Sequence, residues 1–211
     1  DEGRDMLTSL VKRYSNSKIL TKKTNKKLMR FSNGTVHMEV EFKDGDDDIL
    51  NGPFKIYFES GKLKTEGVNK DNKWHGRIKD YNEDGILIAD AMMNNGVENG
   101  EDISYHNNGN IKQKSTKING KMNGLVEVYN EDGSKQVDQI YVSGEATGRY
   151  RQYFPDGTMS HDAQKINDEV SGVMECFYET GKLKVTINYD TNLMRIFNPD
   201  GTLYEEKTLE N

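Results

Sequence analysis

The sequence has little of what defines several common classes of protein. Cys176 is the one cysteine among 211 residues, which excludes an internal disulfide. There are only three prolines, and no apolar run reaches the roughly 18 residues of a membrane-spanning helix. Hydrophobic residues make up 33% of the chain and charged residues 30%, which argues against a thick globular core. The sequence nevertheless contains 20 Gly, 11 Tyr and 7 Phe, so we expect a thin ordered structure with one apolar face.

The charge is unevenly distributed along the chain. The net charge is −6, but residues 1–30 hold nine Lys or Arg against three Asp or Glu, and the remainder is acidic. Nucleic acid is therefore not expected as a partner, because phosphate binding needs a concentrated basic face. The chain begins at Asp1, which we interpret as the loss of an upstream segment such as a signal peptide. We expect an exported protein, in the periplasm or at the cell surface, with a cytoplasmic location as the alternative.

An internal repeat of 24 residues dominates the sequence. Two glycine columns and one aromatic column keep this period through six copies without an insertion, which indicates a repeat architecture. The columns are Gly52, Gly76, Gly100, Gly124, Gly148 and Gly172; Gly61, Gly85, Gly109, Gly133, Gly157 and Gly181; and Tyr57, Tyr81, Tyr105, Tyr129, Tyr153 and Phe177.

Each repeat is predicted to be a β-hairpin with two turns. The first turn follows the aromatic residue, as in Tyr81-Asn-Glu-Asp-Gly85, and the second falls near residues 95–100, 119–124 and 143–148. Short polar residues beside Gly are typical of turns, and no gap between turns is long enough for a helix. Apolar residues alternate along residues 36–42 and 87–93, so one sheet face should be apolar and the other solvated.

We therefore predict an all-β fold: an elongated, solenoid-like single antiparallel sheet of tandem hairpins. Six regular repeats over 52–195 with atypical terminal units make up a repeat domain of residues 28–211. Residues 1–27 form a basic N-terminal segment, in which Leu7, Leu10, Val11 and Tyr14 have helical spacing. A short amphipathic helix over residues 5–15 should cap the first hairpin.

At these columns the sequence resembles the MORN repeat, and specifically the variant of bacterial YwqK-type proteins. The resemblance rests on Asn51-Gly52, Tyr57 and Gly61-Lys-Leu-Lys64, echoed at 181–184, and extends over roughly residues 28–205. It implies a sheet of stacked hairpins that serves as an interaction module. Some bacterial members are labelled antitoxins, and others carry a lipid-kinase label. The kinase label does not apply here, because the sequence lacks a glycine-rich nucleotide loop and a catalytic Asp with a Mg²⁺-binding partner.

The aromatic residues are the main candidate site. The column of five tyrosines and Phe177 is expected to pack as a ladder between repeats, with peptide or glycan binding as the alternative. The neighbouring, opposite-facing position is not uniform among repeats, and its larger side chains are the better candidates for a binding patch. These candidates are Phe58, His106, Phe154 and Tyr178.

No catalytic, cofactor or metal site is predicted. The four histidines are not spaced as ligands, and Cys176 has no base or orienting partner nearby in sequence. Asp44 and Asp46–Asp48 could chelate Ca²⁺, but they lack the spacing and later Glu of a calcium loop, so a solvated acidic turn is expected.

The sequence thus predicts a non-enzymatic repeat scaffold that binds an unknown protein partner, at the bacterial cell envelope. One alternative is an antitoxin or immunity-type protein that sequesters its partner. The other is peripheral lipid attachment, in which the basic residues of segment 12–30 make weak contact with an anionic membrane surface. The same segment could instead be a solvated linker that balances the acidic body.

Overall fold

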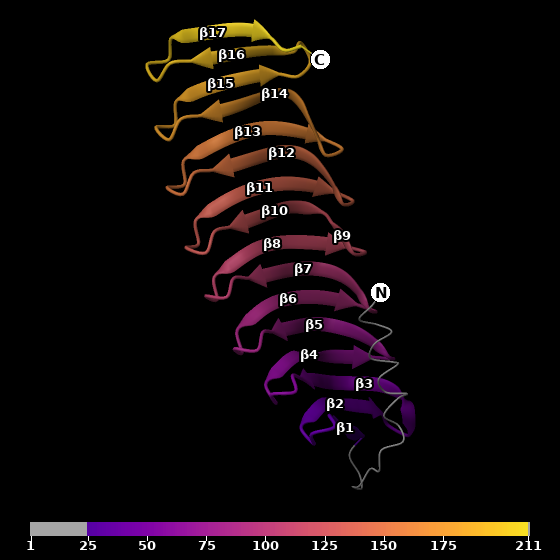
Figure 1. Cartoon of the computed structure of the whole chain (residues 1–211). Helices are drawn as coiled ribbons and strands as arrows, with labels where there is room; N and C mark the ends of the chain where they lie inside the picture. Colours follow the sequence, from indigo (N-terminus) through magenta and orange to yellow (C-terminus); the bar gives the residue numbers. More distant parts are fainter. Residues whose placement is uncertain (1–24, 211) are drawn as a thin grey trace. The chain divides into compact units, whose positions relative to one another are not determined.

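The structure, a computed structural model, describes residues 25–210 of the chain. These residues form strands and turns, and no helix lies among them. The described part of the chain therefore has no helix that is long and apolar enough to cross a membrane. It divides into two compact units, one ending at Gly109 and the other starting at Asn110. In both units each strand pairs antiparallel with the next, apart from the short β9, as Figure 1 shows.

The first unit is a sheet of seven strands in chain order. Six antiparallel hairpin pairings, β1–β2 to β6–β7, connect them. The strands are β1 (Lys26–Arg30), β2 (Val36–Lys43), β3 (Asp46–Tyr57), β4 (Leu63–Lys70), β5 (Lys73–Tyr81), β6 (Leu87–Asn94) and β7 (Val97–Tyr105).

The second unit repeats the same plan. The strand β8 pairs with the two-residue β9 and with β10, and each later strand pairs with its successor. The strands are β8 (Ile111–Ile118), β9 (Lys121–Met122), β10 (Gly124–Tyr129), β11 (Lys135–Val142), β12 (Glu145–Tyr153), β13 (Met159–Ile166), β14 (Glu169–Phe177), β15 (Leu183–Asn188), β16 (Leu193–Phe197) and β17 (Leu203–Thr208).

One set of turns follows the aromatic column, as predicted. After β3, the Phe58 N–H donates to the Lys62 carbonyl at 2.8 Å and the Gly61 N–H donates to the Phe58 carbonyl at 2.9 Å. Gly61 has φ +83°, in the left-handed region that glycine adopts at little cost. The same pair of bonds recurs after β12 and β14, so these glycines end equivalent hairpin loops.

The other set of turns is tighter than predicted. Only Asn95 and Gly96, at φ +51° and +79°, connect β6 to β7, and two positive φ values define a type I′ turn. Gly100 lies inside β7, where three residues oppose Met92 in a β-bulge. A Cβ at Gly100 would lie 2.8 Å from the Met92 side chain, so this glycine column serves bulges and not turns.

The acidic segment also differs from its prediction. The connection between β2 and β3 is the two-residue turn Asp44-Gly45, and Asp46–Asp48 already belong to β3. Leu50 pairs with Phe42 and Asp46 with Lys43, so a second bulge absorbs the three residues between them. This bulge accounts for the 27 residues between Gly34 and Gly61, against 24 between Gly61 and Gly85.

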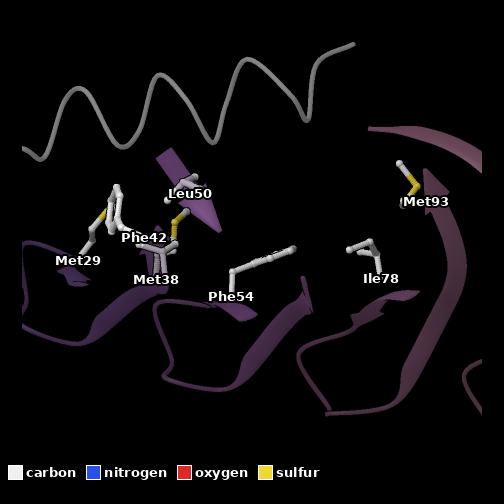
Figure 2. Close-up of a cluster of buried hydrophobic side chains, with 8 residues drawn as sticks. Met29, Met38, Phe42, Leu50, Phe54, Ile78 and Met93 are labelled. Atoms are coloured by element: carbon white, nitrogen blue, oxygen red, sulfur yellow. The ribbon is translucent and has the colours of Figure 1, made fainter. Parts of the chain in front are cut away.

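One face of the first unit carries a hydrophobic core cluster, which is drawn in Figure 2. Trp74 stacks on Phe54 with ring centroids 5.7 Å apart and planes 10° from parallel. The cluster consists of Met29, Met38, Val40, Phe42, Leu50, Phe54, Ile78 and Met93. The second unit buries the smaller Val126, Ala146 and Ala163. We call the side that bears these residues the core face and the opposite side the ladder face.

The prediction of a short N-terminal helical cap is corrected. There is no helix between residues 25 and 210, and the first element the structure describes is a strand. Backbone pairing places β1 at the end of the first unit: Leu28 pairs with Glu39 and Met29 with Met38. Residues 5–15, on which the helix was predicted, lie outside the described residues.

A substitution at Gly67 measures how tightly the core face is packed. A Cβ at this position would overlap Ile78 Cδ1 and come within 3.0 Å of Phe54 Cε1. Gly67→Ala should therefore lower the free energy of unfolding by about 1–3 kcal/mol through overpacking. Urea unfolding checks this value, and Ile78→Val in the same chain should restore part of the loss because it removes Cδ1. An unchanged midpoint for Gly67→Ala would contradict the packing.

Candidate functional site

A row of charged residues crosses the ladder face of the first unit. In this row each residue lies directly opposite the next on the neighbouring strand, and the signs alternate. Opposite charges at directly paired positions stabilise a sheet, whereas like charges destabilise it. The row is Glu39, Lys55, Glu66, Lys79 and Asp90.

The second unit has its own row, in which the alternation of signs is broken at two carboxylate pairs and at one uncharged residue. Glu127 pairs with Asp138, Asp162 with Glu175, and Thr186 interrupts the charges. The row is Lys114, Glu127, Asp138, Arg151, Asp162, Glu175, Thr186, Arg195 and Glu206. We call the two rows the charge ladders of their units.

Asp138 is the most enclosed member of the ladders, with a side chain only 2% exposed. Arg151 binds it with two parallel N–H donors, at 2.8 and 2.9 Å, and the Tyr153 hydroxyl donates to it at 2.8 Å. Lys135 lies 3.7 Å away and also contacts Glu127 at 2.5 Å. These cations offset the repulsion between Asp138 and its neighbour Glu127, so the network compensates for the break in alternation.

Lys135 occupies the repeat position that is apolar elsewhere, namely at Leu63, Leu87, Ile111, Met159 and Leu183. The structure shows why it is there: its ammonium neutralises two paired carboxylates of the ladder. Sequence reasoning missed the ladder as a whole. Its members recur at 24-residue spacing, but only the register reveals that they face one another.

The tyrosine column lies beside the ladders and is bonded to them. Tyr57 donates to Glu39 at 2.9 Å, Tyr81 to Glu66 at 2.9 Å, and Tyr153 to Asp138 at 2.8 Å. Burial, followed by the bond to a carboxylate, raises the pKa of Tyr57 and of Tyr81 to about 12. Burial likewise raises the pKa of Tyr105, Tyr129 and Tyr153. These hydroxyls therefore hold their protons at neutral pH, and those of Tyr57, Tyr81 and Tyr153 orient the carboxylates that they bind.

The four predicted patch residues lie at separate turns. Phe58 and His106 are in the first unit, at turns that the Asn82 turn separates, whereas Phe154 and Tyr178 are at consecutive loops of the second unit. All four are half-buried. Lys64 Nζ lies 5.6 Å from the ring centroid of Phe58 and Lys184 Nζ 5.4 Å from that of Tyr178. The predicted patch residues therefore lie one at each loop, two in each unit.

Cys176 on β14 lies directly opposite His161 on β13, and both side chains are on the core face. Burial raises the pKa of the thiol, and burial together with nearby Lys184 lowers the pKa of the imidazole. Both groups are therefore neutral near pH 7, whereas a cysteine nucleophile requires a thiolate. Among residues 25–210, no three His, Cys, Asp or Glu side chains are grouped so that they could hold a metal ion.

A shallow cavity of about 230 Å³ opens beside the ladder of the first unit. Its charged lining is Lys55, Arg77 and Lys79 against the single Glu66. Arg77 binds Asp90 at 2.9 Å and Glu101 at 2.6 Å, and Lys55 lies 4.0 Å from Glu66. The carboxylates on either side of Lys79 thus have other donors. Lys79 forms no ion pair with another residue of the described chain.

Comparisons with known proteins identify the repeat. The family model of the MORN repeat variant matches residues 50–69, on β3 and β4, and residues 171–191, on β14 and β15. No curated protein matches the chain significantly.

Among solved structures, the wild-type TCP10 domain of Danio rerio CPAP, in complex with a STIL peptide, is 18% identical. The match covers 91% of this chain and 98% of that one, with a TM-score of 0.21. A Bacteroides fragilis protein of unknown function is 11% identical over 75% of this chain and 93% of its own, with a TM-score of 0.13.

The Asp138 network should contribute measurably to stability. Asp138→Ala leaves Arg151 and Tyr153 without their acceptor, so the free energy of unfolding should fall by about 2–4 kcal/mol. Glu206→Ala removes a ladder carboxylate that is 45% exposed in its ion pair with Arg195, and should cost under about 1 kcal/mol. Chemical denaturation compares the two variants. Equal losses would show that Asp138 is no more important than a surface carboxylate.

His161 should titrate below the pH range of an exposed imidazole. Because its pKa is lowered in the folded chain, the unfolded chain binds a proton first as pH falls, and stability should decrease below about pH 6.5. Two-dimensional NMR of the His161 ring follows the titration in the native chain and in urea. Identical midpoints in the two states would refute this environment.

Proposed function

Since the chain is a MORN-variant repeat protein, with the repeat matched on β3–β4 and on β14–β15, we propose that it is a non-enzymatic scaffold that binds a protein partner through its ladder face. The observation that supports this most is the ladder itself, a row of charged residues that lie opposite one another on the ladder face of each sheet. MORN repeats generally serve interaction and not catalysis. The arrangement of the described residues is consistent with this, because the cysteine and its opposed histidine are both neutral.

The charges that are not used internally are the ones available to a partner. Within the first ladder, Glu39 accepts a hydrogen bond from Tyr57 and Glu66 accepts one from Tyr81. Asp90 forms an ion pair with Arg77. Lys79 is left over at the cavity, and Lys55 is 47% exposed at 4.0 Å from its carboxylate. An acidic side chain of a partner would bind these two cations without breaking a short ion pair. Such electrostatic complementarity provides orientation and a fast association rate.

Exported location, an antitoxin role and lipid contact remain proposals from the sequence. The basic segment to which lipid contact was assigned begins at Lys12, and its residues up to 24 lie outside the described chain. Within the described part, Lys26 already binds Glu41 at 2.8 Å, and Lys27 lies over the Phe42 ring at 4.2 Å and 3.5 Å from Asp47. These lysines have internal partners, so the protein-binding role is favoured over the lipid-binding one.

The test is affinity purification of the full chain from the source cell, identification of the retained protein, and measurement of its affinity in purified form. Charge reversal of Lys55 and Lys79 to Glu should weaken that affinity, and the affinity of the native chain should fall as salt is raised. Lys207→Glu, an exposed change on the core face of β17, is the control and should have little effect. If the reversal leaves binding unchanged, the ladder face of the first unit is not the binding surface.

A further inference from the structure

Three exposed β-branched aliphatic residues mark the second unit. They are the last residues of β8, β11 and β13, each immediately before a type I′ turn. Their exposed fractions are 48% for Ile118, 52% for Val142 and 57% for Ile166. Exposed aliphatic residues that recur at one position of a repeat indicate a contact surface more strongly than scattered ones do.

The three residues lie on the ladder face of the second unit. Side chains alternate along a strand, and each lies four residues beyond a ladder member, namely Lys114, Asp138 and Asp162. A further aliphatic pair adjoins them on the same face, where Leu125 and Ile140 are opposite each other at 47% and 37% exposure. Together the five residues form what we call the aliphatic row.

The fold itself does not require aliphatic side chains at these strand ends. The equivalent positions of the first unit are Lys70 and Asn94, which are also exposed and precede turns of the same type. Because both units form the same hairpins, the difference between them concerns the surface and not the strand or the turn.

Charged residues alternate with the row. Lys121 lies opposite Ile118, Glu145 opposite Val142, and Glu169 opposite Ile166. These three are exposed and make no ion pair with a described residue. Across the strands the surface therefore reads aliphatic, basic, aliphatic, acidic, aliphatic, acidic.

The spacing of this pattern fits a helix. Consecutive aliphatic residues are one hairpin apart, which is two strand separations or about 9.6 Å. A helix advances about 10.5 Å in seven residues, and about 5 Å in three to four, the distance to the intervening charge. An extended peptide returns to the same face after about 6.8 Å or 13.6 Å and matches neither distance.

We infer that the aliphatic row is a docking surface for an amphipathic helix of the partner, lying across the strands of the second unit. Its aliphatic residues recur every seven positions over Ile118, Val142 and Ile166. Between its aliphatic residues it carries an acidic residue opposite Lys121 and Lys or Arg opposite Glu145, and beyond the last of them Lys or Arg opposite Glu169. This inference rests on the proposed protein-binding function and specifies the chemistry of the partner.

A designed peptide of about 21 residues tests the inference directly. It has Leu at every seventh position and a fluorescent label. Glu lies between the leucines that face Ile118 and Val142, one Lys between those that face Val142 and Ile166, and a second Lys after the leucine that faces Ile166. Anisotropy titration with the full chain should show binding. Val142→Asp should weaken binding by about tenfold or more, because it places a charge among the aliphatic contacts. Asn94→Asp is the matched control in the first unit and should change the affinity by less than about twofold.

A charge reversal separates specific docking from general hydrophobic adhesion. Glu145→Lys together with Glu169→Lys should reject the basic peptide and bind the version in which Glu replaces its lysines. Absence of peptide binding, equal binding to Val142→Asp, or indifference to the reversal would each overturn the inference. Self-association of the native chain that Val142→Asp abolishes, measured by sedimentation, would assign the row to a second copy and overturn it too.

The natural partner distinguishes this failure from that of the proposed function. A partner that binds Val142→Asp as well as the native chain would leave the scaffold function intact and refute only the role of the aliphatic row. A chain that retains no natural partner but binds the peptide through the row would refute the proposed scaffold function and support the row as a surface that binds a helix.

Discussion

Backbone hydrogen bonding between consecutive strands is the interaction on which each unit depends. A hairpin has too small an apolar face to be stable alone, so its neighbour must be held at an exact register. Two kinds of turn set that register, one ending in a glycine such as Gly61 and the other built on paired left-handed residues such as Asn95-Gly96. A slip of one residue would exchange the faces of a strand and bring ladder charges into the core.

The glycines inside the strands have a different task. At Gly100 and Gly148 the bulged backbone approaches Met92 and Ile140 of the preceding strand, at positions where a Cβ would crowd them. Gly67 instead leaves room for Ile78 and Phe54 on the core face. The bulges thus add residues to one strand of each pair without loss of the alternation on the other, so the ladder remains aligned.

Charge replaces hydrophobic burial on the ladder face. A sheet with a modest core leaves its other side in water. Alternating cross-strand charges stabilise that side without exposing a large apolar patch. Where the alternation fails, between Glu127 and Asp138, extra donors from Arg151, Lys135 and Tyr153 compensate. Lys79 and the aliphatic row are exceptions to this pattern of cross-strand charge pairing.

The sequence by itself determined the repeat, its period, the hairpins and the turn after each aromatic residue, because turn chemistry and strand alternation are local. It also indicated the MORN repeat variant, whose family model matches residues 50–69 and 171–191. It placed the second turn too broadly, since a type I′ turn and a nearby bulge both call for glycine and differ only in pairing. The cap helix it predicted has no counterpart in the described residues. Only the tertiary structure decided which charges face one another, that His161 lies opposite Cys176, and that Lys135 belongs to a network. These relations depend on register between strands, and the bulges shift that register by amounts that no local pattern encodes.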